Sequence, residues 1–135
     1  MEIKTISFPK HTNDTASLSF LEAERNIPFA IKRVYYIFDV ADGARRGLHA
    51  HKKLQQVLIC IHGSCKILLD DGTEKEVVKL ADPAEGLMVG NAVWREMFDF
   101  SPGSVLLVLA SEYYNESDYI RDYKEFLSYL KEEEK

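Results

Sequence analysis

The sequence predicts an all-β jelly roll followed by a C-terminal α-helix. Short runs of branched and aromatic residues recur about every ten residues over the first 110 positions, and turn signals separate them. About nine such runs are typical of a jelly roll. Beyond position 116 the apolar residues take helical spacing instead. A chain of 135 residues has room for one core. We therefore expect one domain, 1–135, with a barrel over about 1–112 and a helix over about 116–131.

The expected strands are bounded by turn residues. The strongest signal is Asp70–Thr73, whose Asp-Gly step favours a tight turn. The runs are Ile3–Phe8, Ser17–Leu21, Ile31–Phe38, Leu54–Ile61, Cys65–Leu69, Glu74–Leu80, Gly86–Val89, Ala92–Phe98 and Val105–Ala110.

The tail has an amphipathic pattern. Charged residues separate apolar positions that would share one face of a helix. Asn115 or Ser117 would cap its start. We expect this helix to lie against the barrel and to use its apolar stripe for packing. The stripe consists of Tyr119, Ile120, Tyr123, Phe126, Leu127 and Leu130.

Composition excludes several classes of partner. A net charge of −5 argues against nucleic acid. Apolar runs such as Val57–Ile61 and Val105–Ala110 are too short to span a bilayer, and Met1–Phe8 lacks the apolar centre of a signal peptide. We expect a cytoplasmic protein, in which Cys60 and Cys65 are free thiols that pack as small apolar residues.

The positive charges are unevenly distributed. Six of them fall between positions 32 and 53, in the region that also carries two histidines. A cationic cluster in an acidic chain predicts a pocket for an anionic small molecule. The cluster consists of Lys32, Arg33, Arg45, Arg46, Lys52 and Lys53.

The most informative pattern is His49-Ala50-His51. Residues two apart on a strand point the same way, so the two imidazoles should project side by side. Gly47, the two histidines, Gln56 and Gly63 stand at the spacing of the first cupin motif. The segment Val89–Arg95 resembles the second cupin motif, with Arg95 in place of its histidine.

These replacements argue against a metal. A metal cupin uses two histidines and a glutamate from the first motif and one histidine from the second. Here Gln56 stands for the glutamate, and the guanidinium of Arg95 cannot coordinate a cation. Two ligands are fewer than the three that a catalytic metal usually needs. We expect no metal and no other cofactor.

The groups that remain suit proton transfer. Histidines titrate near neutral pH, so His49 and His51 can act as general acid and base. On the strand over 32–38, Arg33, Tyr35 and Ile37 share a face, although the pattern does not decide which face looks inward. We take His49, His51 and Tyr35 as catalytic candidates. His11 and His62 should lie on the surface, and Trp94 should pack in the core.

Taken together, these segments resemble the dTDP-4-keto-6-deoxyglucose 3,4-ketoisomerases. The similarity runs from about Ile6 to Tyr123. It is carried by Ile27–Phe29, Ile31–Tyr36, His49–Leu54, Gln56–Leu58, Asp82–Pro83, Gly86–Leu87, Val93–Trp94, Val108–Ser111 and Asp118–Arg121.

The resemblance implies a cupin-type homodimer that acts on a dTDP-linked keto sugar and supplies 3-amino-3,6-dideoxyhexoses. It implies a diphosphate held by arginines, for which we take Arg33 and Arg46, and catalysis by the positions of His49 and His51. We expect the edge run Ile3–Phe8 to pair across the two-fold axis.

The family differs at two positions that bear on the configuration of the product at C4. At the position of Arg95 some members carry histidine, and at the position of Thr15 some carry arginine or tyrosine. Arg95 favours the gluco product, whereas Thr15 matches neither pattern. The configuration therefore stays open.

The implied reaction removes the C3 hydrogen, passes through an enediol and protonates C4. It is internally balanced and needs no redox cofactor. One histidine would serve carbon and the other the oxygens, in an order that the sequence leaves open. Gln56, Arg95 and Tyr35 would donate to the enediolate.

Three alternatives remain. A nucleotide-sugar 3,5-epimerase would need an aspartate paired with a histidine, and the sequence shows no clear equivalent. A sugar-binding module would need no catalysis. A metal-dependent cupin oxygenase is opposed by Gln56 and Arg95.

Overall fold

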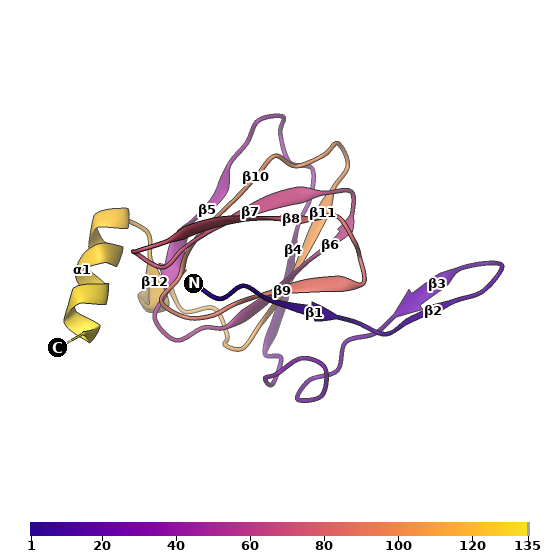
Figure 1. Cartoon of the computed structure of the whole chain (residues 1–135), viewed down its shortest axis with the longest axis horizontal. Helices are drawn as coiled ribbons and strands as arrows, with labels where there is room; N and C mark the ends of the chain where they lie inside the picture. Colours follow the sequence, from indigo (N-terminus) through magenta and orange to yellow (C-terminus); the bar gives the residue numbers. More distant parts are fainter. Residues whose placement is uncertain (135) are drawn as a thin grey trace.

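Two five-stranded antiparallel sheets form the body of the chain in the computed structural model, which describes residues 1–134 (Figure 1). The first sheet has the order β1 (Lys4–Ser7), β9 (Glu85–Val89), β6 (Gln56–His62), β11 (Val105–Ala110) and β4 (Arg33–Ile37). The second has the order β12 (Tyr119–Ile120), β5 (Arg46–His51), β10 (Trp94–Phe98), β7 (Cys65–Asp70) and β8 (Lys75–Leu80). The predicted all-β jelly roll is confirmed. The two sheets remain separate and do not close into one continuous barrel.

The main core lies between the two sheets. Side chains alternate along each strand, so Leu58 and Cys60 of β6 face inward while Val57 and Ile59 face outward. Cys65 joins the inner cluster from β7, and both cysteines are free and buried, as predicted. Burial of this apolar face fixes the strand register, because a slip of one residue would expose it.

A loop covers the outer face of the first sheet. Ile27, Phe29 and Ile31 of this loop pack with Val57 and Ile59. Because the loop buries the outward-facing residues of β6, this central strand is apolar on both faces. The outer face of β4 is less covered: Val34 and Tyr36 remain 53% and 59% exposed.

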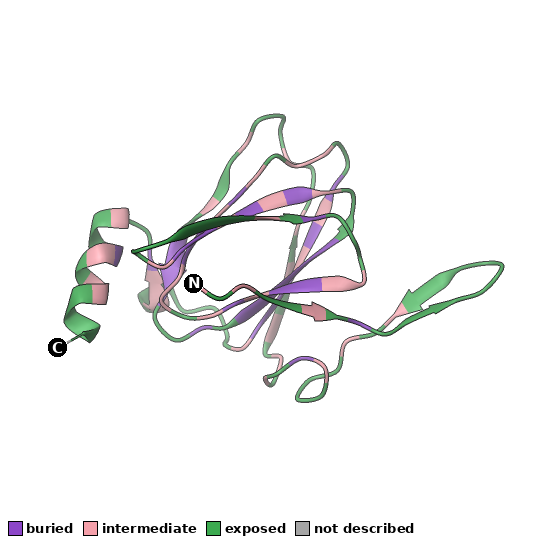
Figure 2. Cartoon of the chain, in the orientation of Figure 1, coloured by how far each residue is buried: buried purple, intermediate pink, exposed green. Residues whose placement is uncertain are grey.

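A separate two-stranded hairpin lies outside the two sheets. It consists of β2 (Lys10–Thr12) and β3 (Ser17–Ser19), and it extends away from the body (Figure 1). The hairpin is exposed nearly throughout (Figure 2). Asn13 shapes its turn by accepting hydrogen bonds from the backbone N–H groups of Thr15 and Ala16. Thr15 therefore lies at the tip of the hairpin.

The C-terminal helix begins later in the sequence than predicted. Helix α1 spans Tyr123–Glu133, and the segment before it is a 3₁₀ turn, η1 (Glu116–Asp118), followed by strand β12. The predicted start near 116 is wrong because β12 pairs with β5, which removes Tyr119 and Ile120 from the helical stripe. The rest of the stripe packs as expected, with Phe126 fully buried against Trp94.

The N-terminal strand pairs within its own chain. Strand β1 forms an antiparallel pair with β9, in which Thr5 lies opposite Leu87. Because β1 is the terminal strand of its sheet, its other edge has no strand partner within residues 1–134, and the pairing of Ile3–Phe8 across a two-fold axis stays a prediction for that edge. Among residues 1–134, no helix has the length and apolar character needed to cross a bilayer.

Candidate active site

The two predicted histidines lie together on the inner face of β5. Their ring centroids are 4.8 Å apart and the rings cross at 85°. His49 is 8% exposed, and His51 is completely buried. Ala50, between them, faces the other way and packs with Phe126 of the helix. The period of two therefore places both imidazoles in the interior, at one end of the core.

A β-bulge precedes the histidines. The register between β10 and β5 shifts after Arg95, so Leu48 is an extra residue between Gly47 and His49. Gly47 has φ +84°, and a Cβ there would lie 3.2 Å from the carbonyl oxygen of Arg95. Only glycine fits this position without strain. The bulge brings the Gly47 carbonyl within 2.9 Å of His49 Nδ1.

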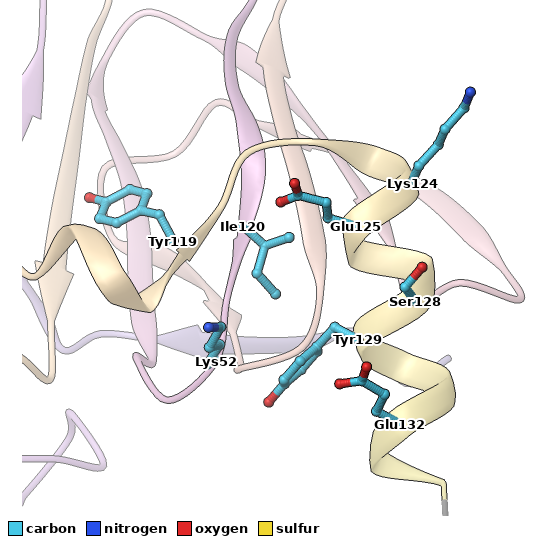
Figure 3. Close-up of a pocket in the computed structure, with 8 residues that line it drawn as sticks. All are labelled: Lys52, Tyr119, Ile120, Lys124, Glu125, Ser128, Tyr129 and Glu132. Carbon is cyan, nitrogen blue, oxygen red and sulfur yellow. The ribbon is translucent and has the colours of Figure 1, made fainter.

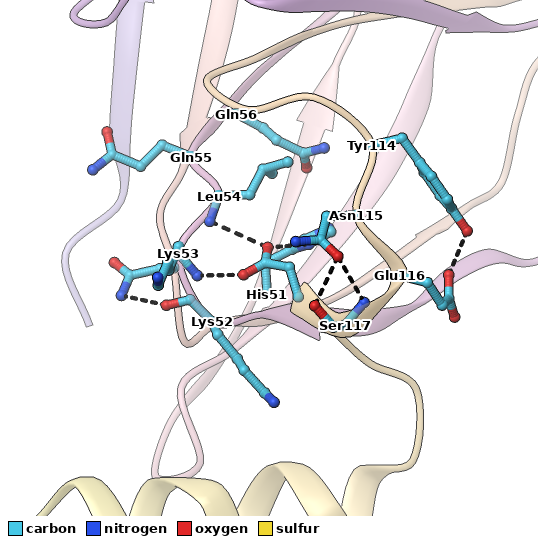
Figure 4. Close-up of polar contacts among 12 residues, drawn as sticks. His51, Lys52, Lys53, Leu54, Gln55, Gln56, Tyr114, Asn115, Glu116 and Ser117 are labelled. Atoms are coloured by element: carbon cyan, nitrogen blue, oxygen red, sulfur yellow. Dashed lines mark hydrogen bonds and ion pairs between the residues drawn. The ribbon is translucent and has the colours of Figure 1, made fainter.

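His51 has a different partner, a carboxylate distant in the sequence. Its Nδ1 lies 3.1 Å from Oδ2 of Asp118, which is in η1. The same carboxylate accepts hydrogen bonds from the backbone N–H groups of Lys53 and Leu54 (Figure 4). No aspartate partner for a histidine was evident in the sequence, and Asp118 takes that place in the structure.

Both histidines keep a free ring nitrogen. Nε2 of His49 and Nε2 of His51 are buried and have no hydrogen-bond partner within the described chain. Burial and the charge of Arg95 lower the pKa of His49 to about 4 and that of His51 to about 2. At neutral pH both rings are therefore uncharged. Since Nδ1 of each ring faces an acceptor and carries the hydrogen, Nε2 holds the lone pair.

Arg95, Gln56 and Tyr35 form a hydrogen-bonded chain beside the histidines. Nη1 of Arg95 donates to Oε1 of Gln56 at 2.7 Å, and Nε2 of Gln56 donates to the Tyr35 hydroxyl at 2.9 Å. Nη2 of Arg95 donates to the carbonyl oxygens of Val93 and Gly90. Arg95 is completely buried, which lowers its pKa to about 10. The Tyr35 oxygen accepts in this chain, so its own hydrogen is free for a ligand.

A pocket of about 370 Å³ opens beside these groups. Arg33 and Arg46 both line it, together with Tyr35 and His49. Arg33 lies over the ring of Tyr35 at 5.2 Å, and its Nε and Nη2 atoms are buried without a partner in the described chain. Arg46 is exposed. Of the seven predicted site residues, four line this pocket: Arg33, Tyr35, Arg46 and His49. The other three, His51, Gln56 and Arg95, are completely buried and are not among its lining residues.

Three further residues line the pocket that were not predicted as site residues: Tyr114, Tyr119 and Arg121. Tyr119 and Arg121 fall within the segment 116–131 that was predicted to be helical. Tyr119 contacts both imidazoles, with ring centroids 5.0 Å from His49 and 4.3 Å from His51. Arg121 lies over the Tyr119 ring at 4.2 Å, and Tyr114 lies nearby. Figure 3 shows Tyr119 directed away from helix α1, while Ile120 lies on the helix side. The segment Asp118–Arg121, which carries part of the family resemblance, was the available signal for these site residues. It was assigned to the helix because the apolar residues around it have helical spacing.

The surface histidines and Trp94 lie where they were predicted. His11 and His62 are exposed, and Trp94 is buried against the helix. Within residues 1–134, no three His, Cys, Asp or Glu side chains are grouped as metal ligands. Gln56 and Arg95 hydrogen-bond to each other at the two replaced cupin positions. The residues present therefore do not fit the metal of a cupin.

A jelly roll with an inward pair of neutral histidines beside a buried arginine is an enzyme scaffold of the cupin type, suited to proton transfer. The comparisons with known proteins agree. The family model "FdtA: WxcM-like, C-terminal" matches residues 1–131. The chain belongs to this family.

A curated relative is TDP-4-oxo-6-deoxy-alpha-D-glucose-3,4-oxoisomerase of Aneurinibacillus thermoaerophilus. It is 55% identical over 130 residues, which are 96% of this chain and 94% of the relative. The predicted family resemblance is thereby confirmed.

Two solved structures share the fold closely. One is a histidine-to-asparagine mutant of the 3,4-ketoisomerase QdtA from Thermoanaerobacterium thermosaccharolyticum, in complex with TDP-4-keto-6-deoxyglucose. It has a TM-score of 0.94 and 49% identity, and the match covers 96% of this chain and 94% of that one. The other is a 3,4-ketoisomerase from Helicobacter canadensis, with a TM-score of 0.94, 49% identity and coverage of 97% and 98%.

Proposed function

We propose that this chain is a 3,4-ketoisomerase that moves the ketone of dTDP-4-keto-6-deoxy-D-glucose from C4 to C3. The named relatives act in this class, and the matches cover nearly the whole of both chains. The observation that carries the proposal is the pair of buried imidazoles, each with an unpartnered Nε2. Two adjacent bases of this kind are what an isomerisation by proton transfer requires.

The reaction balances with proton transfers alone. A base removes the C3 hydrogen, which the C4 carbonyl acidifies, and the electron pair forms the enediolate. Protonation of C4 then completes the exchange, while the C3 oxygen loses its hydrogen and the C4 oxygen gains one. His49 and His51 divide these transfers between carbon and oxygen. Each general acid or base is worth roughly 10²–10⁴-fold in rate.

Arg95 supports the anionic intermediate. The guanidinium is fully buried and has no ion-pair partner among residues 1–134. A buried charge without a counterion is unfavourable in the empty site, but it stabilises negative charge that develops nearby. Gln56 transmits this polarisation to Tyr35, whose hydroxyl can donate to a substrate oxygen.

The arginines around the pocket suit the diphosphate. Arg33 has two buried donor atoms without partners, and Arg46 is exposed at the mouth. Guanidinium groups bind phosphate oxygens bidentately. Arg121 is a third candidate, because it lines the same pocket and Glu116 holds it in place through two hydrogen bonds.

We keep the proposals of a homodimer and of a cytoplasmic location. Exposed apolar side chains on the outer face of β4 and on the hairpin offer a surface that a second copy would bury. They include Leu18 on the hairpin, Val34 and Tyr36 on β4, and Phe38 directly after β4. The free thiols of Cys60 and Cys65 suit a reducing compartment.

The pairing of His51 with Asp118 favours one alternative, a 3,5-epimerase, for which the sequence had shown no aspartate. The two functions predict different labelled products. Incubation of dTDP-4-keto-6-deoxyglucose with the protein in D₂O, followed by NMR, separates them. The isomerase gives a ketone at C3 and deuterium at C4. An epimerase leaves the ketone at C4 and places deuterium at C3 and C5, and a sugar-binding module leaves the substrate unlabelled. Either of the last two results would overturn the proposal.

A further inference from the structure

We propose that Asp118 is a positioning residue: it accepts the Nδ1 hydrogen of His51 and thereby holds the imidazole in the tautomer whose Nε2 is free to take a proton. The catalytic meaning of this contact rests on the proposed function. The tautomer itself is a property of the chain that can be measured without any substrate.

The direction of the hydrogen bond follows from the other partners of the carboxylate. Oδ1 accepts from the backbone N–H of Lys53 at 2.8 Å, and Oδ2 accepts from the N–H of Leu54 at 3.3 Å (Figure 4). Both oxygens are thus acceptors facing donors. The third contact, 3.1 Å to His51 Nδ1, must then take its hydrogen from the imidazole.

The backbone around Asp118 is fixed from two sides. Its N–H donates to the Asn115 carbonyl at 3.0 Å, and its own carbonyl accepts from Lys52 N–H at 3.1 Å. The next residue, Tyr119, lies opposite His51 in the β12–β5 pair. The side chain of Asp118 is 13% exposed. The carboxylate is therefore held at one place relative to the imidazole, as an orienting group must be.

The other histidine is oriented by different means. Nδ1 of His49 meets the main-chain carbonyl of Gly47, an acceptor that no side-chain substitution removes. A neutral imidazole has one donor and one acceptor nitrogen, and the partner at Nδ1 decides which is which. Of the two site histidines, only His51 has its tautomer set by a side chain.

The test is Asp118→Asn in the full chain. Asparagine has the shape of aspartate but only one carboxamide oxygen. When that oxygen accepts from Lys53 N–H, the NH₂ group takes the place of Oδ2 and faces both Nδ1 of His51 and the N–H of Leu54 as a donor. We expect the hydrogen of His51 to move to Nε2. Two-bond ¹H–¹⁵N spectra of the substrate-free protein distinguish the two tautomers, because protonated and unprotonated ring nitrogens give well-separated signals. Asp122→Asn is the matched control, since this exposed residue next to α1 makes no side-chain capping hydrogen bond.

Kinetics provide the second measurement. We expect Asp118→Asn to lower kcat by roughly 10²-fold or more, the scale of a lost general base, while KM for the nucleotide sugar changes less than about twofold. A purely structural role would lower stability or raise KM without reversing the tautomer. Asp122→Asn should match the wild type in both measurements.

Several results would overturn the inference. His51 protonated at Nε2 in the wild-type protein would do so directly, and this measurement decides the question even if Asp118→Asn does not fold. An unchanged tautomer in the variant, or a reversed tautomer with normal kcat, would do so as well. If the wild-type protein shows no ketoisomerase activity, the proposed function fails, while the tautomer measurement still judges the contact between Asp118 and His51.

Discussion

Arg95 lies directly opposite His49 in the paired strands β10 and β5. This register places the buried guanidinium beside an imidazole that is only 8% exposed. The cation opposes protonation of the ring, in addition to the larger effect of burial. Arg95 therefore keeps the histidine pair in its basic form and also offers positive charge to an anionic intermediate.

The free energy of unfolding should depend on pH through the two histidines. Each ring has a pKa of about 6.5 in the unfolded chain and a lowered pKa in the folded one, about 4 for His49 and about 2 for His51. The unfolded state thus binds more protons below pH 6.5, so stability falls as the pH drops from about 6.5 towards 4. We expect a loss of about 1–2 kcal/mol per histidine between pH 7 and pH 5. Urea unfolding at the two pH values measures it, and the doubly substituted His49→Asn/His51→Asn protein should lose less.

The single variants His49→Asn and His51→Asn should each fold, bind the nucleotide and lose roughly 10²–10⁴-fold in kcat. Asparagine keeps polarity and some bulk but cannot transfer a proton near pH 7. The variant that lacks the carbon base should also fail to exchange the C3 hydrogen with D₂O, whereas the other should still exchange it. Near-normal isomerisation by both variants would make the histidines structural and favour the sugar-binding module.

Arg33→Ala and Arg46→Ala should raise KM more than they lower kcat. Contacts to a diphosphate persist from the ground state to the transition state. Their loss therefore weakens the binding of the substrate and of the transition state equally, which raises KM and leaves kcat nearly unchanged. We expect an increase in KM of about tenfold, the scale of one charge-assisted hydrogen bond. Lys79→Ala, on the exposed face of β8, is the control. A wild-type KM in both arginine variants would show that these arginines lie on the protein surface without binding the diphosphate.

The purified protein should contain no stoichiometric metal. Gln56 and Arg95 hydrogen-bond to each other where a metal cupin has ligands, and two histidines alone bind a catalytic metal poorly. Elemental analysis should give well under one Zn, Fe, Mn or Ni per chain, and EDTA should leave the activity unchanged. About one metal ion per chain would contradict this reading of the motif.

The chain should sediment as a dimer at micromolar concentration. Val34 is 53% exposed on the outer face of β4, and Val34→Glu should shift the equilibrium towards monomer if this face is the interface. Val77→Glu, at an equally exposed valine on β8, should not. A wild-type monomer in sedimentation equilibrium would refute the homodimer.

Local spacing predicted much of the site. The alternation of side chains along a strand predicted that His49 and His51 share a face. The spacing of the two cupin motifs predicted that Gln56 and Arg95 belong to the site. These relations depend on residues near one another in the sequence, where periodicity is informative. The inward direction of Arg33 and Tyr35 needed the second sheet, because alternation alone does not say which face is buried.

Asp118 and Tyr119 were missed for a physical reason. Their neighbours Ile120 and Tyr123 stand at helical spacing, and a local pattern cannot show that β5 is an edge strand open to pairing. The contact from Asp118 to His51 joins residues 67 positions apart. Only the folded chain reveals such a contact, since many segments could in principle have covered the edge of β5.

The pairing of β12 with β5 also sets an order of events during protein synthesis. Translation proceeds from the N-terminus, so the strand with His49 and His51 is made long before Asp118 and Tyr119. Until the later segment emerges, one edge of the histidine strand is uncovered and His51 lacks its carboxylate partner. A chain truncated near residue 112 would contain every strand of both sheets except β12, but only an unfinished pocket. The pocket is thus completed only by the contact of Asp118 and Tyr119 with strand β5, which closes a long loop of the chain.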